Sequence, residues 1–126
     1  MLNIAQYGLL IILSIFLGLH ILVLLKIIPY NIVWGGRLMS DKEMYRFETV
    51  SILINLIFLF IILVHSNYLA IDFPKKIMTL ILWIMTAMFA FNTVGNAMSK
   101  NKLEQKLFTP ITIILTIFSL ILALTN

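Results

Sequence analysis

The stretch GLLIILSIFLGLHILVLL, residues 8–25, decides the fold class of this chain. It contains no Asp, Glu, Lys or Arg, and as a helix rising ~1.5 Å per residue it would be ~27 Å long, close to the hydrocarbon thickness of a bilayer. No Lys or Arg precedes it, and no small-residue cleavage site follows its apolar core. We therefore expect a retained transmembrane helix rather than a cleaved secretory signal.

Three further apolar runs follow, and each is close to the length that a membrane-spanning helix needs. Ser40 with Glu43 forms a capping box that predicts a helix start near Asp41. Thr109 with Pro110 resembles an N-cap followed by the first helical position. The sequence predicts an all-α integral membrane protein, a single four-transmembrane-helix bundle within residues 1–126, with helices at about 7–28, 41–66, 74–98 and 109–124.

The composition supports a bilayer as the solvent of this fold. Of the 126 residues, 62% are apolar and 11% are charged, against roughly a quarter charged in soluble domains. A soluble domain of this size buries too little of its surface to hide so many apolar side chains. The absence of cysteine excludes disulfides, thiolate metal sites and a cysteine nucleophile. The sequence gives no indication of a cofactor or a metal site.

The basic residues are distributed unevenly over the connecting segments. The first and third carry seven of the nine: Lys26, Arg37, Lys42, Arg46, Lys100, Lys102 and Lys106. The second carries the other two, Lys75 and Lys76. The positive-inside rule therefore places loops 1 and 3 in the cytoplasm and both termini outside. We expect a multi-pass protein of the cell membrane, a bacterial inner membrane, whose basic residues contact lipid headgroups rather than nucleic acid.

Polar residues recur at one depth within the predicted helices. Glu48 and Asn55 lie near one face of the second helix, and Asn92 and Asn96 share a face of the third. His20 and the two deeper asparagines lie ~9–12 Å from the predicted cytoplasmic ends of their helices, at 1.5 Å per residue. Two interpretations remain open. The polar groups form interhelical hydrogen bonds, or they line a cavity open to the cytoplasm, because polar groups at membrane depth are costly and often functional.

Single residues allow the same two interpretations. Glu48 is expected near the interface, where Arg46 and Lys42 neutralise it, or at the mouth of a cavity. His20 is a proton relay or, more simply, a histidine hydrogen-bonded within the bundle. The segment Trp34–Arg37, with its two glycines, predicts a tight turn that either binds an anion through backbone N–H groups or is anchored at the headgroups by its tryptophan.

Several segments together resemble a group of small bacterial four-helix integral membrane proteins. They are Ile28-Pro29-Tyr30, Trp34-Gly35-Gly36-Arg37-Leu38, Arg46-Phe47-Glu48, Asn92-Thr93-Val94-Gly95-Asn96 and Phe108-Thr109-Pro110. The resemblance covers nearly the whole chain. It implies the four-helix architecture and no activity.

The leading hypothesis for function is a non-enzymatic membrane protein whose cytoplasm-facing polar pocket binds or passes a small polar or anionic solute. Its candidate ligand-binding residues are Arg37, Arg46, Glu48, Asn55, Asn92, Asn96 and His20. The alternative is a structural or accessory subunit, as a homodimer or with a partner membrane protein, whose polar faces only join helices. A third hypothesis is an enzyme acting on a lipid or quinone with Glu48 or His20 as acid–base. It is disfavoured because neither residue has a nucleophile or metal partner at a defined spacing.

Overall fold

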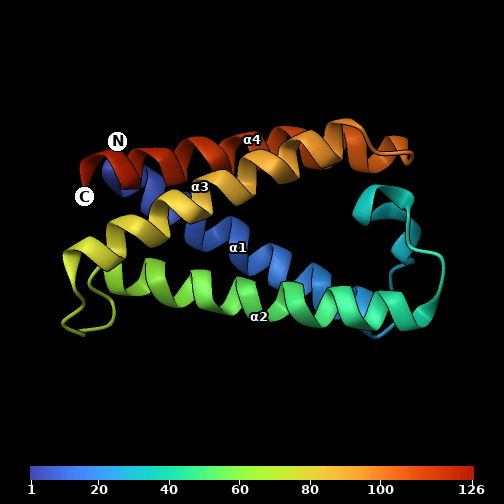
Figure 1. Ribbon diagram of the computed structural model, residues 1–126, viewed down its shortest axis with the longest axis horizontal. Coiled ribbons are helices and arrows are strands. Elements are labelled where there is room, and N and C mark those ends of the chain that lie inside the picture. The colour runs from blue at the N-terminus through green and yellow to red at the C-terminus, as the bar shows by residue number, and fades with distance from the viewer.

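The computed structural model is an all-helical bundle built from four long helices (Figure 1). The helices are α1 (Leu2–Leu24), α2 (Asp41–His65), α3 (Lys75–Ala97) and α4 (Lys102–Thr125). All four are long and apolar enough to span a membrane. Two short 3₁₀ turns, Tyr30–Ile32 and Trp34–Gly36, lie in the first loop. The structure describes residues 1–34 and 36–126 in full and Gly35 by its backbone alone.

Successive helices run in opposite directions, so the connecting segments gather at two ends of the bundle. Both termini lie at the same end as the second loop, residues 66–74 (Figure 1). The first loop, residues 25–40, and the α3–α4 connection, residues 98–101, lie at the other end, called here the first-loop end. This arrangement is the one expected of four consecutive crossings.

The start of α2 confirms the capping box, whereas the start of α4 differs from the prediction. The Glu43 backbone N–H donates to Ser40 Oγ over 3.2 Å, and α2 begins at Asp41. The fourth helix begins at Lys102 rather than at Thr109. The reason is a stronger N-cap upstream, because Asn101 Oδ1 accepts from two backbone N–H groups over 2.9 and 3.1 Å. Pro110 therefore lies inside the helix, not at its start.

The first helix ends earlier than expected, at Leu24 rather than near residue 28. Lys26 adopts a positive φ of 62°, and the backbone N–H of Ile27 bonds back to the Leu22 carbonyl over 2.9 Å, which closes the helix. The Lys26 ammonium then donates to the Asp41 carboxylate and joins the end of α1 to the start of α2. This hydrogen bond raises the pKa of Lys26 above its usual value.

The buried apolar side chains form two separate clusters. The larger joins all four helices and fills the half of the bundle nearer the termini, with Leu9, Ile62, Leu82 and Leu122 among its members. The smaller lies under the first loop and contains Val23, Val33 and Met44. The site described below contains polar side chains that lie on the helices between these two clusters.

Close packing of α1 on α4 depends on Gly8. The Phe118 ring of α4 lies directly over Gly8, so a Cβ atom at this position would overlap the ring. In a bilayer, helices associate through such close packing, since lipid is as apolar as the helix surfaces. Gly18, nearly three turns further along α1, has open space where its Cβ would be.

We expect Gly8→Leu to lower the free energy of unfolding by about 1–3 kcal/mol, because the added side chain displaces the Phe118 ring. Reversible unfolding of the purified protein in mixed detergent micelles measures the change. Gly18→Leu is the matched control on the same helix, with no loss of stability, since leucine favours helix over glycine by up to ~1 kcal/mol. Equal behaviour of the two variants would contradict the packing described for Gly8.

Candidate functional site

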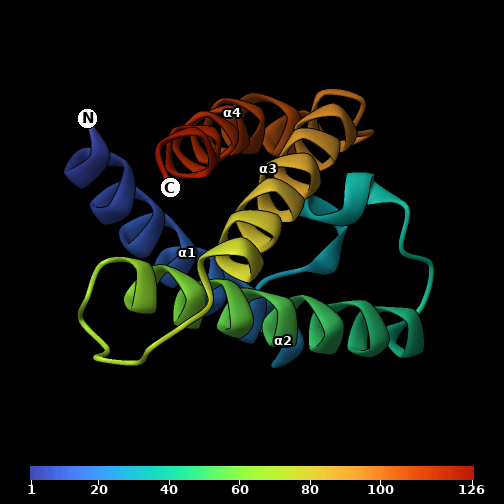
Figure 2. The ribbon, with the colours of Figure 1, turned by 60° about the vertical axis from the view of Figure 1, so that its left-hand side comes forward.

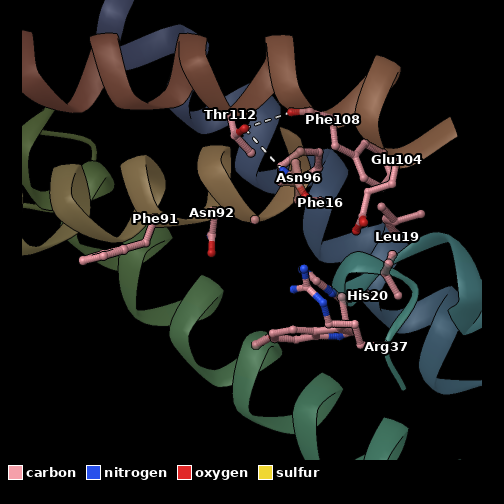
Figure 3. A pocket seen from close by; sticks show the side chains of 14 residues that line it. Phe16, Leu19, His20, Arg37, Phe91, Asn92, Asn96, Glu104, Phe108 and Thr112 are labelled. Carbon is pink, nitrogen blue, oxygen red and sulfur yellow. Dashed lines mark hydrogen bonds between the residues drawn. The ribbon is translucent and has the colours of Figure 1, made fainter. Parts of the chain in front are cut away.

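A cavity of about 240 Å³ lies between the four helices at the first-loop end (Figure 3). All four helices and the first loop contribute to its wall, which combines aromatic and polar side chains. The lining residues are Phe16, Leu19, His20, Val33, Trp34, Arg37, Ser51, Phe91, Asn92, Gly95, Asn96, Glu104, Phe108 and Thr112.

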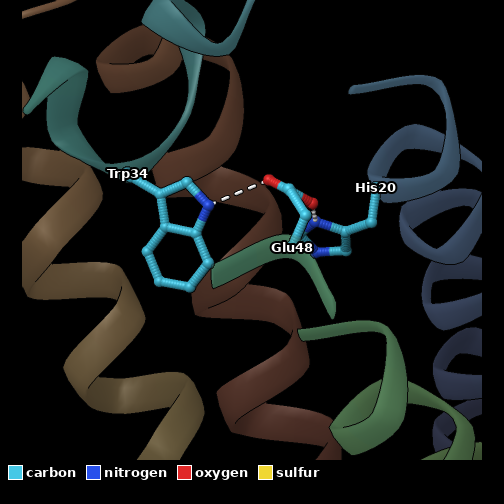
Figure 4. A network of polar contacts seen from close by, with 3 residues as sticks. All are labelled: His20, Trp34 and Glu48. Atoms are coloured by element: carbon cyan, nitrogen blue, oxygen red, sulfur yellow. Dashed lines mark hydrogen bonds and ion pairs between the residues drawn. The ribbon is translucent and has the colours of Figure 1, made fainter. Parts of the chain in front are cut away.

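A buried carboxylate stands behind two residues of this wall (Figure 4). Glu48 of α2 is fully buried and does not itself line the cavity. Its Oε2 lies 2.6 Å from His20 Nδ1 of α1, and its Oε1 accepts from Trp34 Nε1 over 2.9 Å. Each carboxylate oxygen therefore has a partner. Such pairing is what a buried acidic group requires, because an unpaired charge inside a protein is strongly unfavourable.

The same network fixes the first loop over the bundle. Trp34 has a φ of 58°, a left-handed conformation that is rare for a bulky side chain. Such strain persists only where surrounding contacts enforce it. Here the contacts are the hydrogen bond to Glu48 and a tilted ring contact with Phe47, with 5.0 Å between centroids. The indole N–H of Trp34 thus points inward to Glu48, so this donor is used within the protein.

The third and fourth helices supply most of the polar groups of the cavity wall opposite His20 and Trp34. Asn96 Nδ2 donates to Thr112 Oγ1 over 3.3 Å, which joins α3 to α4. The Thr112 hydroxyl donates back to the Phe108 carbonyl of its own helix over 2.9 Å (Figure 3). Asn92, one turn before Asn96, also lines the cavity but is exposed, and its side chain has no hydrogen bond to any described residue.

The structure brings together most of the residues that the sequence singled out. His20, Arg37, Asn92 and Asn96 line the cavity. Figure 3 shows the Arg37 and His20 side chains on the side of the cavity opposite Asn96. Glu48 does not line the cavity but supports its wall through hydrogen bonds to His20 and Trp34. Its predicted partners were wrong, because it pairs with His20 and Trp34 rather than with Arg46 or Lys42.

Two predicted residues are not part of the cavity. Arg46 is exposed, and its guanidinium lies over the Phe47 ring, 5.4 Å from the centroid. Position 46 differs from position 48 by two residues, or about 200° around the helix, so the two side chains leave opposite faces. Asn55 is buried nearly two turns beyond Glu48, among the larger core cluster, and its Oδ1 has no partner among the described residues.

Sequence reasoning missed two contributors, Trp34 as the donor to Glu48 and Glu104 as a wall residue. Glu104 is 2% exposed and lies on the α4 face that also presents Phe108 and Thr112 to the cavity, at a spacing of four residues. Placing the helix start at Thr109 hid this face. The pair Asn101 and Glu104 was the available signal, because Asn at the N-cap with Glu three residues later favours a helix start.

Within the described residues, no three His, Asp or Glu side chains approach closely enough to hold a metal ion. No protein-family model matches this chain, and searches of curated proteins and of solved structures gave no match.

We expect Glu48→Leu to destabilise the protein by about 3–5 kcal/mol, since it removes the partner of His20 and of the Trp34 indole. A double-mutant cycle with His20→Phe, followed by unfolding in mixed micelles, should give a coupling of at least about 1 kcal/mol. Arg46→Gln is the control, with an expected change within about 0.5 kcal/mol. Strictly additive effects of Glu48→Leu and His20→Phe would show that the pair does not hold α1 and α2 together.

Proposed function

We propose that this chain is a small integral membrane protein that binds a small polar ligand in the cavity at the first-loop end. The observation that carries the proposal is the incomplete pairing of the polar side chains around the cavity. The His20–Glu48 and Asn96–Thr112 hydrogen bonds join helices, whereas Asn92, a polar residue in the wall, makes no side-chain hydrogen bond within the described residues. An unpaired and exposed amide in the wall of a cavity is available to hydrogen-bond a ligand, and polar groups at membrane depth are often functional.

The volume limits the size of the ligand. A cavity of about 240 Å³ has the volume of about eight water molecules at ~30 Å³ each. It is smaller than the pockets of ~300–1,000 Å³ that hold drug-sized molecules. The ligand is therefore a small solute or the small polar part of a larger molecule.

The charges around the cavity favour a ligand without net charge. The cavity presents groups of both signs, because the Arg37 guanidinium and the Glu104 carboxyl group line it and Glu48 lies behind it. A neutral polar or zwitterionic ligand can face both kinds of group at once, whereas an anion is matched by the guanidinium alone. Of the polar and anionic solutes that the sequence suggested, we therefore favour the polar ones.

The cavity faces the cytoplasm in this proposal. The first loop and the α3–α4 connection border it, and the first and third polar segments carry seven of the nine basic residues. By the positive-inside rule this end is cytoplasmic and both termini are outside.

A structural role remains the alternative, because the His20–Glu48 pair joins α1 to α2 and the Asn96–Thr112 bond joins α3 to α4. A purely structural protein would not need unpaired polar groups around a cavity. The alternative therefore differs from the proposal at Asn92 and at the open space beside Gly95. Substitutions at these two positions separate the two functions.

We expect Gly95→Leu to remove a bound ligand without unfolding the protein. Gly95 lines the cavity and has no atom within 4 Å of the position of a Cβ, so leucine occupies ligand space rather than protein space. Native mass spectrometry of protein extracted gently from membranes should show an adduct of reproducible mass in the wild type and at least a tenfold lower fraction in Gly95→Leu.

Two controls are matched to this experiment. Gly18→Leu introduces the same side chain on α1, away from the cavity, and Asn55→Leu removes an asparagine that lies outside it. Both should retain the adduct, whereas Asn92→Leu should bind the ligand about tenfold more weakly and carry less of it, since one hydrogen bond of ~1.4 kcal/mol corresponds to tenfold in affinity. An adduct that survives in Gly95→Leu and Asn92→Leu would support the structural role instead.

A further inference from the structure

The four helices are not packed equally, and the cavity lies where packing is weakest. α3 packs against α4, and α1 packs against both α2 and α4, but α2 has few neighbours on α3. Figures 1 and 2 show α3 near α2 at the second loop and diverging from it toward the first-loop end. The Phe58 and Phe89 rings pack edge to face between α2 and α3, with 5.6 Å between centroids, on the second-loop side of the cavity.

The rim of the cavity reaches the outer surface of the bundle on this side. Phe91 and Asn92 of α3 both line the cavity and are both exposed, Phe91 to 78%. Asn92 lies five residues before the end of α3 at Ala97, or about 8 Å along the axis at 1.5 Å per residue. An unpaired amide at this depth faces hydrocarbon at a considerable cost unless a polar partner comes to it.

The first loop covers the cavity at its axial end. Val33 is 5% exposed and packs into the smaller core cluster, and Trp34 is bonded to Glu48. The next turn lies against the α3–α4 connection, because a Cβ at Gly36 would be 3.6 Å from the Asn101 backbone nitrogen. The first loop thus covers part of the axial end, where Arg37 lines the cavity and is exposed, while the side between α2 and α3 is bordered by the exposed Phe91 and Asn92.

We propose that the cavity receives its ligand sideways, between α2 and α3, and that the ligand is an amphiphile with a small zwitterionic headgroup drawn from the adjacent leaflet. This inference rests on the proposed function and names its ligand class. The headgroup lies among Arg37, Asn92 and Asn96, where a guanidinium and amide N–H groups face its phosphate oxygens. The hydrocarbon tail leaves past the exposed Phe91 ring into the lipid. A free zwitterionic solute has the same headgroup chemistry, but it does not need to enter through the lateral opening.

The two tryptophans offer a direct test, because Trp34 lines the cavity and Trp83 lies on α3 outside its lining. In a Trp83→Phe background, Trp34 is the single fluorophore of the chain. The protein is placed in phosphatidylcholine nanodiscs with increasing fractions of phosphatidylethanolamine that carries brominated acyl chains, which quench tryptophan at contact. Brominated phosphatidylglycerol, which is anionic, provides the comparison.

We expect phosphatidylethanolamine to quench Trp34 along a saturable curve, with half-maximal quenching at a mole fraction at least fivefold below that for phosphatidylglycerol. Gly95→Leu should replace the saturable curve by a shallow linear one, and Asn92→Leu should shift its midpoint about tenfold upward. Gly18→Leu should behave as the parent protein does. Circular dichroism and the thermal unfolding midpoint show that each variant is folded.

A second measurement distinguishes the source of the headgroup. Calorimetry with soluble glycerophosphoethanolamine tests the same chemistry without a hydrocarbon tail. If the soluble compound binds and Gly95→Leu abolishes its binding, while both brominated lipids quench equally and linearly, the amphiphile is wrong and the polar-ligand cavity stands. If neither the lipid nor the soluble compound responds to Gly95→Leu and extracted protein carries no adduct, the proposed function fails together with this inference.

Discussion

The buried carboxylate of Glu48 is the constraint on which the rest of this structure depends. A fully buried acidic side chain in a membrane helix must be paired on both oxygens, and its two partners come from different parts of the chain, His20 from α1 and Trp34 from the first loop. Satisfying it therefore sets the approach of α1 to α2 and enforces the left-handed backbone of Trp34. The cavity wall at His20 and Trp34 is a consequence of this pairing.

Much of the fold could be predicted from the sequence because apolar run length and capping chemistry are local properties. The four helices and the start of α2 at Asp41 followed from such signals. The start of α4 did not, because two local signals compete there. Thr109 with Pro110 is a favourable helix start, but Asn101 caps the chain a full two turns earlier, and the helix continues through the proline. Local rules rank such signals poorly when both are strong.

The site was predicted in part because depth along a helix can be counted from sequence, whereas direction and pairing cannot. His20 and Asn92 were expected at one level and do line one cavity, together with Asn96. Asn55 was assigned to the same level, yet it is buried and does not line the cavity, although Ser51, about one turn before it on the same face of α2, does. The role of Trp34 depends on a loop conformation with positive φ, which no periodicity reveals.

The position of the Glu48 pair along the chain also bears on how the protein enters the membrane. His20 and Glu48 both belong to the first two helices, and they are 28 residues apart. An acidic side chain at the centre of a lone helix opposes partition from the translocon by about 2.5–3.5 kcal/mol, a penalty that a hydrogen-bonding partner reduces. We therefore expect the first two helices to insert together as a hairpin during synthesis. The later pair, α3 and α4, can then pack onto a hairpin in which the Glu48 carboxyl group already has its partner on α1.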